Sequence, residues 1–229
     1  MLRSLMLLCI VDSMSNLKRN ILGIYHFVKQ EYLQHQVHHM PVLKLNKEQT
    51  VFLNTNYPKL SYNHTKNVIV GILDFDLKYK DKEQIIDSYN IEIDLNQVSD
   101  LGMPIVREIN GRILSIANQK NTFYGNLHLN NEDGEMCMIL PPKVKERYPN
   151  GFDLKILLEH IEEHLYWISY YEKYNKKPWS EYGHGELGYY QLYLEDKAKY
   201  SVVFKNYFNC KSRPEFRRTI KKLRKKYKI

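Results

Sequence analysis

LDFDLKY (residues 73–79) and YNIEIDL (residues 89–95) are the two segments that decide the fold of this chain. In both segments apolar and polar side chains alternate, which predicts β-strands with one buried face and one solvated face. Such strands form antiparallel sheets that are covered on one side. Asp74 and Asp76 lie on the same polar face, where we expect water around them rather than a catalytic carboxylate pair.

The segments on either side of these strands carry helical periodicity. Apolar residues recur at helical spacing over 17–32, and a longer apolar face runs over 154–168 behind Asp153, a suitable N-cap. A third extended segment, 104–109, ends at an Asn-Gly turn. The segment 35–62 and the stretch after this turn lack periodicity, and we expect both to be irregular. The order of helix, antiparallel strands, loop and helices predicts an α+β fold.

The composition is that of a globular protein. The chain has 229 residues, of which 43% are hydrophobic, enough to bury a core. Its three cysteines, Cys9, Cys137 and Cys210, lie far apart and form no CxxC pair, which favours a reducing, cytoplasmic setting. The apolar run at 5–11 is too short to span a bilayer, so we expect no membrane association.

Two groups of histidines raise the question of a metal site. His35, His38 and His39 lie close together, but no cysteine or acid cluster completes a ligand set. The segment HIEEH (160–164) matches the H-x-x-E-H signature of inverted zinc peptidases, with both imidazoles on one helix face. A third ligand from a later helix is missing, since the last acid, Glu215, lies in a basic tail. We therefore predict no metal or other cofactor, with a zinc hydrolase as the alternative to a solvent- or groove-facing helix edge.

A turn signal and two prolines surround Cys137 in LHLNNEDGEMCMILPP (127–142). Residues 131–134 favour a turn, while Pro141 and Pro142 interrupt regular structure. A structural cysteine is normally enclosed in an apolar strand or helix. We therefore expect the thiol of Cys137 at or near the surface.

The charge around Cys137 differs from that of a cysteine protease or a redox sensor. Glu132, Asp133 and Glu135 disfavour the thiolate and raise the pKa of the thiol. This setting suits a sulfur that exchanges acyl groups with a partner thiol. From the loop alone, an incidental thiol is an equal alternative.

The end of the chain reads as a basic helix. Residues 211–229 hold ten Lys or Arg and one acid, a net +9, which leaves the rest of the chain at −1. From Arg213 onward an apolar stripe recurs at helical spacing: Phe216, Ile220, Leu223 and Tyr227. The alternatives are docking through this stripe, or capture of an acidic protein, a membrane surface or nucleic acid. Without a recognised nucleic-acid module, we favour docking or a protein partner.

The segment around Cys137 resembles the active-site segment of ubiquitin-conjugating enzymes, in which His-Pro-Asn precedes Gly-x-x-Cys by a short loop. His128-Leu129-Asn130 matches the first part and Gly134-Glu135-Met136-Cys137 the second. Leucine replaces the family's proline, and the loop is one residue shorter. Asn130 and Asn131 are therefore both candidates for the family's asparagine.

The resemblance extends over about residues 65–195. MPIVREINGRI (103–113), the His-x-Asn loop, the cysteine and the run 165–193 occur in the order seen in bacterial ubiquitin-conjugating-like proteins, including those encoded beside cyclic-oligonucleotide synthases in antiphage operons. The resemblance implies a ubiquitin-conjugating-like antiparallel sheet flanked by helices, with an N-terminal helix and a basic C-terminal helix.

The expected organisation has four parts. Residues 1–13 form an upstream extension, with Met14 as the natural start, and 14–62 hold the N-terminal helix and the irregular segment. Residues 63–195 form the catalytic domain, and 196–229 the basic tail.

The resemblance implies an acyl transferase whose nucleophile is Cys137. A donor protein's C-terminal carboxyl is carried on this sulfur as a thioester, and an acceptor lysine attacks it. Asn130 or Asn131 would donate a hydrogen bond to the oxyanion, and His128 would brace the loop. His184, between two glycines, is a second imidazole that can approach the site; a structural role is an equal reading.

The resemblance also implies partners. These are a donor protein C-terminus (a cGAS-like nucleotidyltransferase or a ubiquitin-like protein), an acceptor protein with a lysine, and an activating enzyme; no specific nucleic acid is implied. A catalytically silent binding module with the same fold is the main alternative function.

Overall fold

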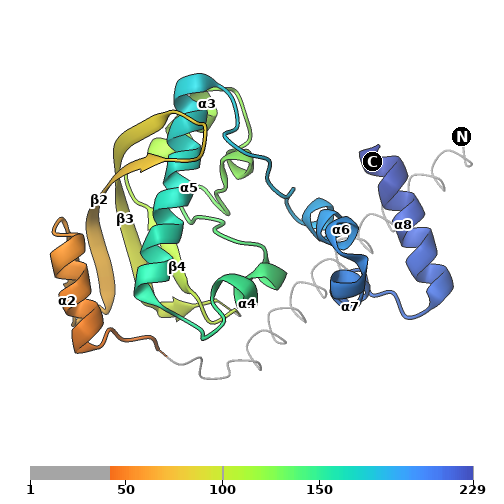
Figure 1. Cartoon of the computed structure of the whole chain (residues 1–229), viewed down its shortest axis with the longest axis horizontal. Coiled ribbons are helices and arrows are strands. Elements are labelled where there is room, and N and C mark those ends of the chain that lie inside the picture. Colours follow the sequence, from red (N-terminus) through yellow and green to blue (C-terminus); the bar gives the residue numbers. More distant parts are fainter. Residues whose placement is uncertain (1–41, 100, 229) are drawn as a thin grey trace, which may run out of the picture. The chain divides into compact units, whose positions relative to one another are not determined.

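The structure is a computed structural model that describes residues 42–99 and 101–228 (Figure 1). The predicted upstream extension, the helix over 17–32, the three clustered histidines and Cys9 lie outside the described residues.

A four-stranded antiparallel sheet forms the centre of the fold. Its strands follow in chain order: β1 (Leu60–Asn63), β2 (Val68–Lys78), β3 (Gln84–Val98) and β4 (Pro104–Glu108). Each strand pairs with the next in antiparallel register. The two alternating segments of the sequence are thus confirmed as the neighbouring strands β2 and β3.

The main core lies between one face of this sheet and helix α5 (Leu154–Tyr174), which crosses it in Figure 1. Asp153 caps α5 as predicted, because its carboxylate accepts the Ile156 N–H at 3.0 Å. The apolar sides of β2, β3 and α5 are almost fully buried: Leu73, Ile91, Ile93, Leu158, Ile161 and Trp167. Asp74 and Asp76, on the opposite face of β2, are exposed, as the alternation predicts.

Two helices fall in segments that we expected to be irregular. The segment 35–62 contains α2 (Lys47–Asn56) as well as β1, and the stretch after β4 contains α3 (Arg112–Gln119). A capping box between Asn46 and Gln49 starts α2. The Asn-Gly turn leads into α3, whose first turn is held by the buried Glu108: its carboxylate accepts the Ile113 N–H at 3.1 Å.

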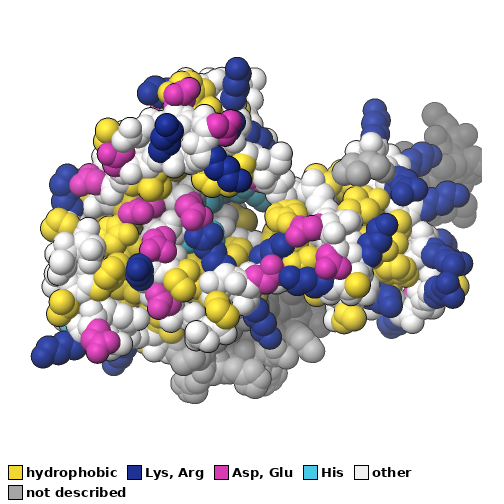
Figure 2. All heavy atoms as spheres, viewed as in Figure 1, with side chains coloured by type: hydrophobic (Ala, Val, Ile, Leu, Met, Phe, Trp, Pro, Cys, Tyr) yellow, Lys and Arg dark blue, Asp and Glu magenta, His cyan; other side chains and the backbone are white. Residues whose placement is uncertain are grey.

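The segment that follows the Cys137 loop contains the short helix α4 (Val144–Arg147). Three further helices, α6 (Glu186–Glu195), α7 (Lys197–Tyr207) and α8 (Arg213–Tyr227), share a small second core around Tyr190, Phe204 and Leu223. The predicted apolar stripe of α8 packs into this core, while its Lys and Arg side chains remain on the surface (Figure 2). The domain boundary expected at residue 195 falls between α6 and α7, which share this core.

No helix in the described part of the chain is both long enough and apolar enough to cross a bilayer.

Candidate active site around Cys137

Residues 128–137 fold as a short hairpin that carries the candidate nucleophile. The Cys137 N–H donates to the His128 carbonyl at 2.7 Å, and the Asn130 N–H donates to the Glu135 carbonyl at 2.8 Å. Leu129 and Met136 pair between them, and both are buried in the main core. The hairpin therefore holds His128 and Cys137 opposite one another.

Gly134 attaches this hairpin to the edge of the sheet. Its carbonyl accepts the Glu108 N–H at 2.9 Å, and the Met136 N–H donates to the Val106 carbonyl at 2.9 Å. The hairpin therefore pairs alongside β4 at the edge of the sheet. Gly134 has φ +80°, and a Cβ there would come within 2.0 Å of the Glu108 carbonyl oxygen. Only glycine fits this position, which explains the glycine of the Gly-x-x-Cys pattern.

The side chains of both candidate asparagines contact Glu135. Asn130 is exposed and donates through Nδ2 to Glu135 Oε1 at 2.8 Å. Asn131 donates to Glu135 Oε2 at 3.3 Å, while its own Oδ1 accepts the N–H groups of Asp133 and Glu135. Asn131 therefore stabilises the turn, and Asn130 is the freer of the two amides.

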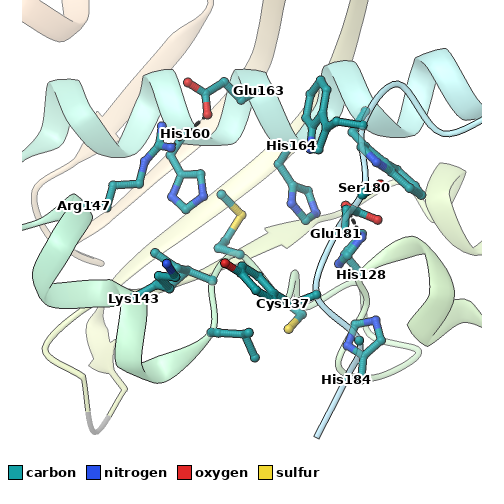
Figure 3. A pocket seen from close by; sticks show the side chains of 17 residues that line it. His128, Cys137, Lys143, Arg147, His160, Glu163, His164, Ser180, Glu181 and His184 are labelled. Carbon is teal, nitrogen blue, oxygen red and sulfur yellow. Dashed lines mark ion pairs between the residues drawn. The ribbon is translucent and has the colours of Figure 1, made fainter. Parts of the chain in front are cut away.

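Cys137 is half-buried and lines a cavity of about 350 Å³ (Figure 3). Burial raises the pKa of its thiol, and the negative charge of Glu135 raises it further. The sequence predicted the direction of this shift from charge alone, whereas burial is the larger cause. The thiol is consequently protonated at neutral pH and lies at a cavity wall rather than fully in solvent.

The cavity brings the predicted His128 and His184 together with two histidines of α5. In Figure 3, His160 and His164 reach in from α5, and Cys137, His128 and His184 come from the loop segments across from them. The ring centroid of His128 lies 5.2 Å from that of His164 and 5.3 Å from that of His184. His128 and Cys137 from one hairpin and His184 from a distant segment therefore line one cavity, whereas Asn130 and Asn131 are not among its lining residues.

Glu181 is the functional candidate that the sequence did not reveal. Its Oε1 lies 2.7 Å from His128 Nε2, but off the line of a good hydrogen bond. The Trp167 ring meets the His128 ring edge-on at 5.1 Å. Glu181 and Trp167 thus contact the imidazole of His128 and limit its orientation.

Two of the cavity histidines, His184 and His164, are shifted toward the neutral form. Burial, and then the nearby His128, lower the pKa of His184. Burial holds the pKa of His164 well below its usual range, and its Nε2 is sealed from solvent without a hydrogen-bond partner among the described residues.

Two residues of the H-x-x-E-H segment, His160 and Glu163, contact other side chains of the protein. His160 Nδ1 and Tyr148 Oη form a hydrogen bond of 2.9 Å, and Glu163 pairs with Arg147 at 2.9 Å. Burial lowers the pKa of His160 to about 3, with a further contribution from Arg147. Within the described ranges, no three His, Cys, Asp or Glu side chains are arranged to hold a metal ion. The segment faces the cavity, where His160 and Glu163 are held by these contacts and His164 Nε2 has no hydrogen-bond partner among the described residues.

Lys143 joins this cavity to the C-terminal helices. Its Nζ lies 3.0 Å from Glu195 and 3.5 Å from Glu146. Burial lowers the pKa of Lys143, but hydrogen bonds with Tyr200 and Glu195 outweigh burial, so the pKa is raised. The ammonium group of Lys143 is therefore already neutralised by the carboxylates of Glu195 and Glu146.

No family model matches the chain, and neither the curated proteins nor the solved structures contain a match. The structure itself shows an α+β fold with a four-stranded antiparallel sheet and a half-buried cysteine at the end of a hairpin.

Proposed function

We propose that this protein is a ubiquitin-conjugating-like acyl transferase that carries a donor protein on Cys137 as a thioester. The observation that carries the proposal is the position of Cys137: it ends a hairpin anchored to the sheet edge and opens to a cavity lined by His128 and His184. A reducing cytoplasm suits this chemistry, because the thiol must remain free.

In the first step Cys137 takes the acyl group from a partner's thioester. The sulfur of Cys137 attacks the carbonyl carbon, a new C–S bond forms, and the partner's C–S bond breaks. Cys137 loses its proton and the partner's thiolate gains one, so no oxidant or reductant is needed. A thiol with a raised pKa remains mostly protonated between turnovers, which limits side reactions.

In the second step an acceptor lysine, as the neutral amine, attacks the thioester. A C–N bond forms, the C–S bond breaks, and the Cys137 thiolate leaves and is protonated. Asn130 is our candidate donor to the oxyanion, because its exposed hydrogen bond with Glu135 has a small net free energy and is easily exchanged. His184, shifted toward its neutral form on the cavity wall, is our candidate for accepting the amine proton.

The pathway is proposed from the sequence resemblance alone. We propose bacterial antiphage defence, with a cGAS-like nucleotidyltransferase as the donor whose C-terminus is conjugated, and a separate activating enzyme upstream. A ubiquitin-like protein is the alternative donor.

Trapping in cells that carry the native gene neighbourhood tests this function. We expect the wild type to form a covalent adduct with one protein that thiol reductants release, and Cys137→Ala to form none. Cys137→Ser should give either a reductant-resistant ester or no adduct, and Cys210→Ala, the matched cysteine control, should behave as the wild type. Identical behaviour of all four versions would instead identify a catalytically silent binding module.

A further inference from the structure

The C-terminal helices contain a second cavity, which shares no lining residue with the cavity at Cys137. It measures about 370 Å³ and is bounded by α7, the α7–α8 loop and the start of α8. Among the described residues, four cations line it and no carboxylate does: Lys197, Lys205, Lys211 and Arg213. A concave wall of one charge sign focuses positive potential and attracts anions.

Helix α7 aligns three of the polar groups. Lys197, Ser201 and Lys205 follow one another at intervals of four residues, so they share one face of the helix. The Ser201 hydroxyl makes only a long bond, 3.4 Å, to the Ala198 carbonyl of its own helix. It remains available to hydrogen-bond a ligand between the two lysines.

No ion pair in the described part of the chain neutralises any of these four cations. By contrast, Lys199 of α7 and Lys226 of α8 pair with Glu146 and Glu186. The acid in the first turn of α8, Glu215, accepts the N–H groups of Lys211 and Ser212 at 2.8 and 3.1 Å and does not line the cavity. A bound anion would offset the mutual repulsion of these four charges.

Two aromatic rings line the same cavity. Tyr193 and Phe216 meet edge to face with centroids 5.5 Å apart, and Lys205 Nζ lies 5.4 Å from the centroid of the Phe216 ring. A bare inorganic anion would make no use of these rings, whereas a planar aromatic group packs on them. The volume lies within the range of about 300–1,000 Å³ typical of small-molecule sites.

We infer that this cavity binds a small phosphate ester with an aromatic ring, that is, a nucleotide. The phosphates lie against Lys197, Lys205 and Lys211 and accept from Ser201, while the base packs on Tyr193 and Phe216. This site is independent of acyl transfer at Cys137.

Calorimetric titration of the full chain with ATP, AMP, adenosine and inorganic phosphate tests the inference. We expect ATP and AMP to bind more tightly than either phosphate or adenosine, with an affinity that falls as salt rises. The double variant Lys205→Ala/Lys211→Ala should lose about tenfold or more in affinity. The control pair Lys221→Ala/Lys225→Ala removes the same charge from exposed positions of α8 outside the cavity and should change affinity less than about twofold.

Ser201→Asp supplies an independent variant if the double variant unfolds. It keeps all four cations, places a carboxylate between two of them, and should abolish nucleotide binding. Failure of the wild type to bind any nucleotide would overturn the inference, as would phosphate binding as tightly as AMP. The inference would also be overturned if the control pair weakened nucleotide binding as much as the double variant, and an oligonucleotide bound more tightly than ATP. That result would assign the binding to general electrostatic attraction by α8.

Discussion

Gly134 and Glu135 determine, at the scale of single residues, what the sulfur of Cys137 can do. Gly134 lets the hairpin approach β4 closely enough for two backbone hydrogen bonds, and this contact sets where the sulfur lies. Glu135 lies opposite Asn130 and raises the pKa of the thiol through its charge. Gly134 thus helps to set the position of the sulfur, and Glu135 adds to the larger effect of burial on the pKa of the thiol.

Gly134→Ala should destabilise the protein by about 2–4 kcal/mol, because strain at positive φ adds to a clash with the Glu108 carbonyl. Gly151→Ala is the matched control: its φ is +84°, but nothing lies within 4 Å of the added Cβ, so it should cost about 1 kcal/mol. Urea unfolding measures both values. Equal costs would contradict the close approach of the hairpin to β4.

Glu135→Gln should speed alkylation of Cys137 at neutral pH by about two- to tenfold. Removing the negative charge lowers the pKa of the thiol, and a larger fraction is then thiolate. Glu132→Gln, at an exposed position of the same turn, should have a smaller effect. Iodoacetamide labelling followed by peptide mass spectrometry gives the rate for Cys137 alone. An unchanged or slower rate in Glu135→Gln would refute the electrostatic argument.

At the scale of elements, Arg112 ties α3 to both the sheet and α5. Its guanidinium donates two hydrogen bonds of 2.8 Å to Asp87 on β3 and one of 2.7 Å to Glu172 on α5. It also lies over the Tyr89 ring, 4.4 Å from the centroid. Helix α3, one of the two helices in segments expected to be irregular, is therefore fixed by contacts between distant segments.

Arg112→Met should cost about 1–3 kcal/mol at neutral pH, because two half-buried carboxylates lose their partner. Burial raises the pKa of Asp87, but hydrogen bonds from Arg112 and Ser169 outweigh it, so the pKa is lowered. This stability is present above the unfolded carboxyl pKa of about 3.9 and is lost as the pH falls through the folded value. The difference between wild type and variant should therefore shrink below about pH 4 in urea titrations.

Lys59→Met is the matched control for Arg112→Met. It removes an ion pair with Asp74 that is 2.6 Å long but exposed, so it should change stability by less than about 0.5 kcal/mol. A comparable loss of stability in both variants would show that the Arg112 network contributes no more than an exposed ion pair.

The sequence predicted elements with strong local periodicity and missed those with little periodicity or with contacts made only on folding. The alternation of β2 and β3, the cap and face of α5 and the stripe of α8 each lie within one segment, and all are present. Only Leu53 of α2 is fully buried, so this helix shows little periodicity, and its signal was the capping box. At the candidate site, Cys137 and His128 were predicted together, but Glu181 approaches His128 only through folding.

At the scale of the whole molecule, buried neutral histidines link the cavity to global stability. Burial lowers the pKa of both His160 and His164 below the ordinary value. Below about pH 6.5 the unfolded chain binds protons that the folded chain does not, so stability falls as the pH falls. This loss continues down to the folded pKa, which for His160 is about 3.

His160→Gln and His164→Gln should each flatten the fall of stability between about pH 6 and 4 by about 1.4 kcal/mol per pH unit. Urea unfolding at a series of pH values measures this slope, and the slope matters rather than the absolute stability of each variant. His64→Gln, at an exposed turn outside the cavity, is the matched control for loss of an imidazole. If all three variants keep the wild-type slope, the cavity histidines are not held neutral by the fold.

The central claim is that the sulfur of Cys137 accepts an acyl group as a thioester. The most direct measurement is intact-protein and peptide mass spectrometry after reaction with a short peptide that ends in a glycyl thioester of mercaptoethanesulfonate. We predict one peptide adduct on Cys137 that dithiothreitol removes, absent from Cys137→Ala and retained in Cys210→Ala. An adduct that forms equally well on Cys210, or no adduct on Cys137 of the folded protein, would contradict the claim.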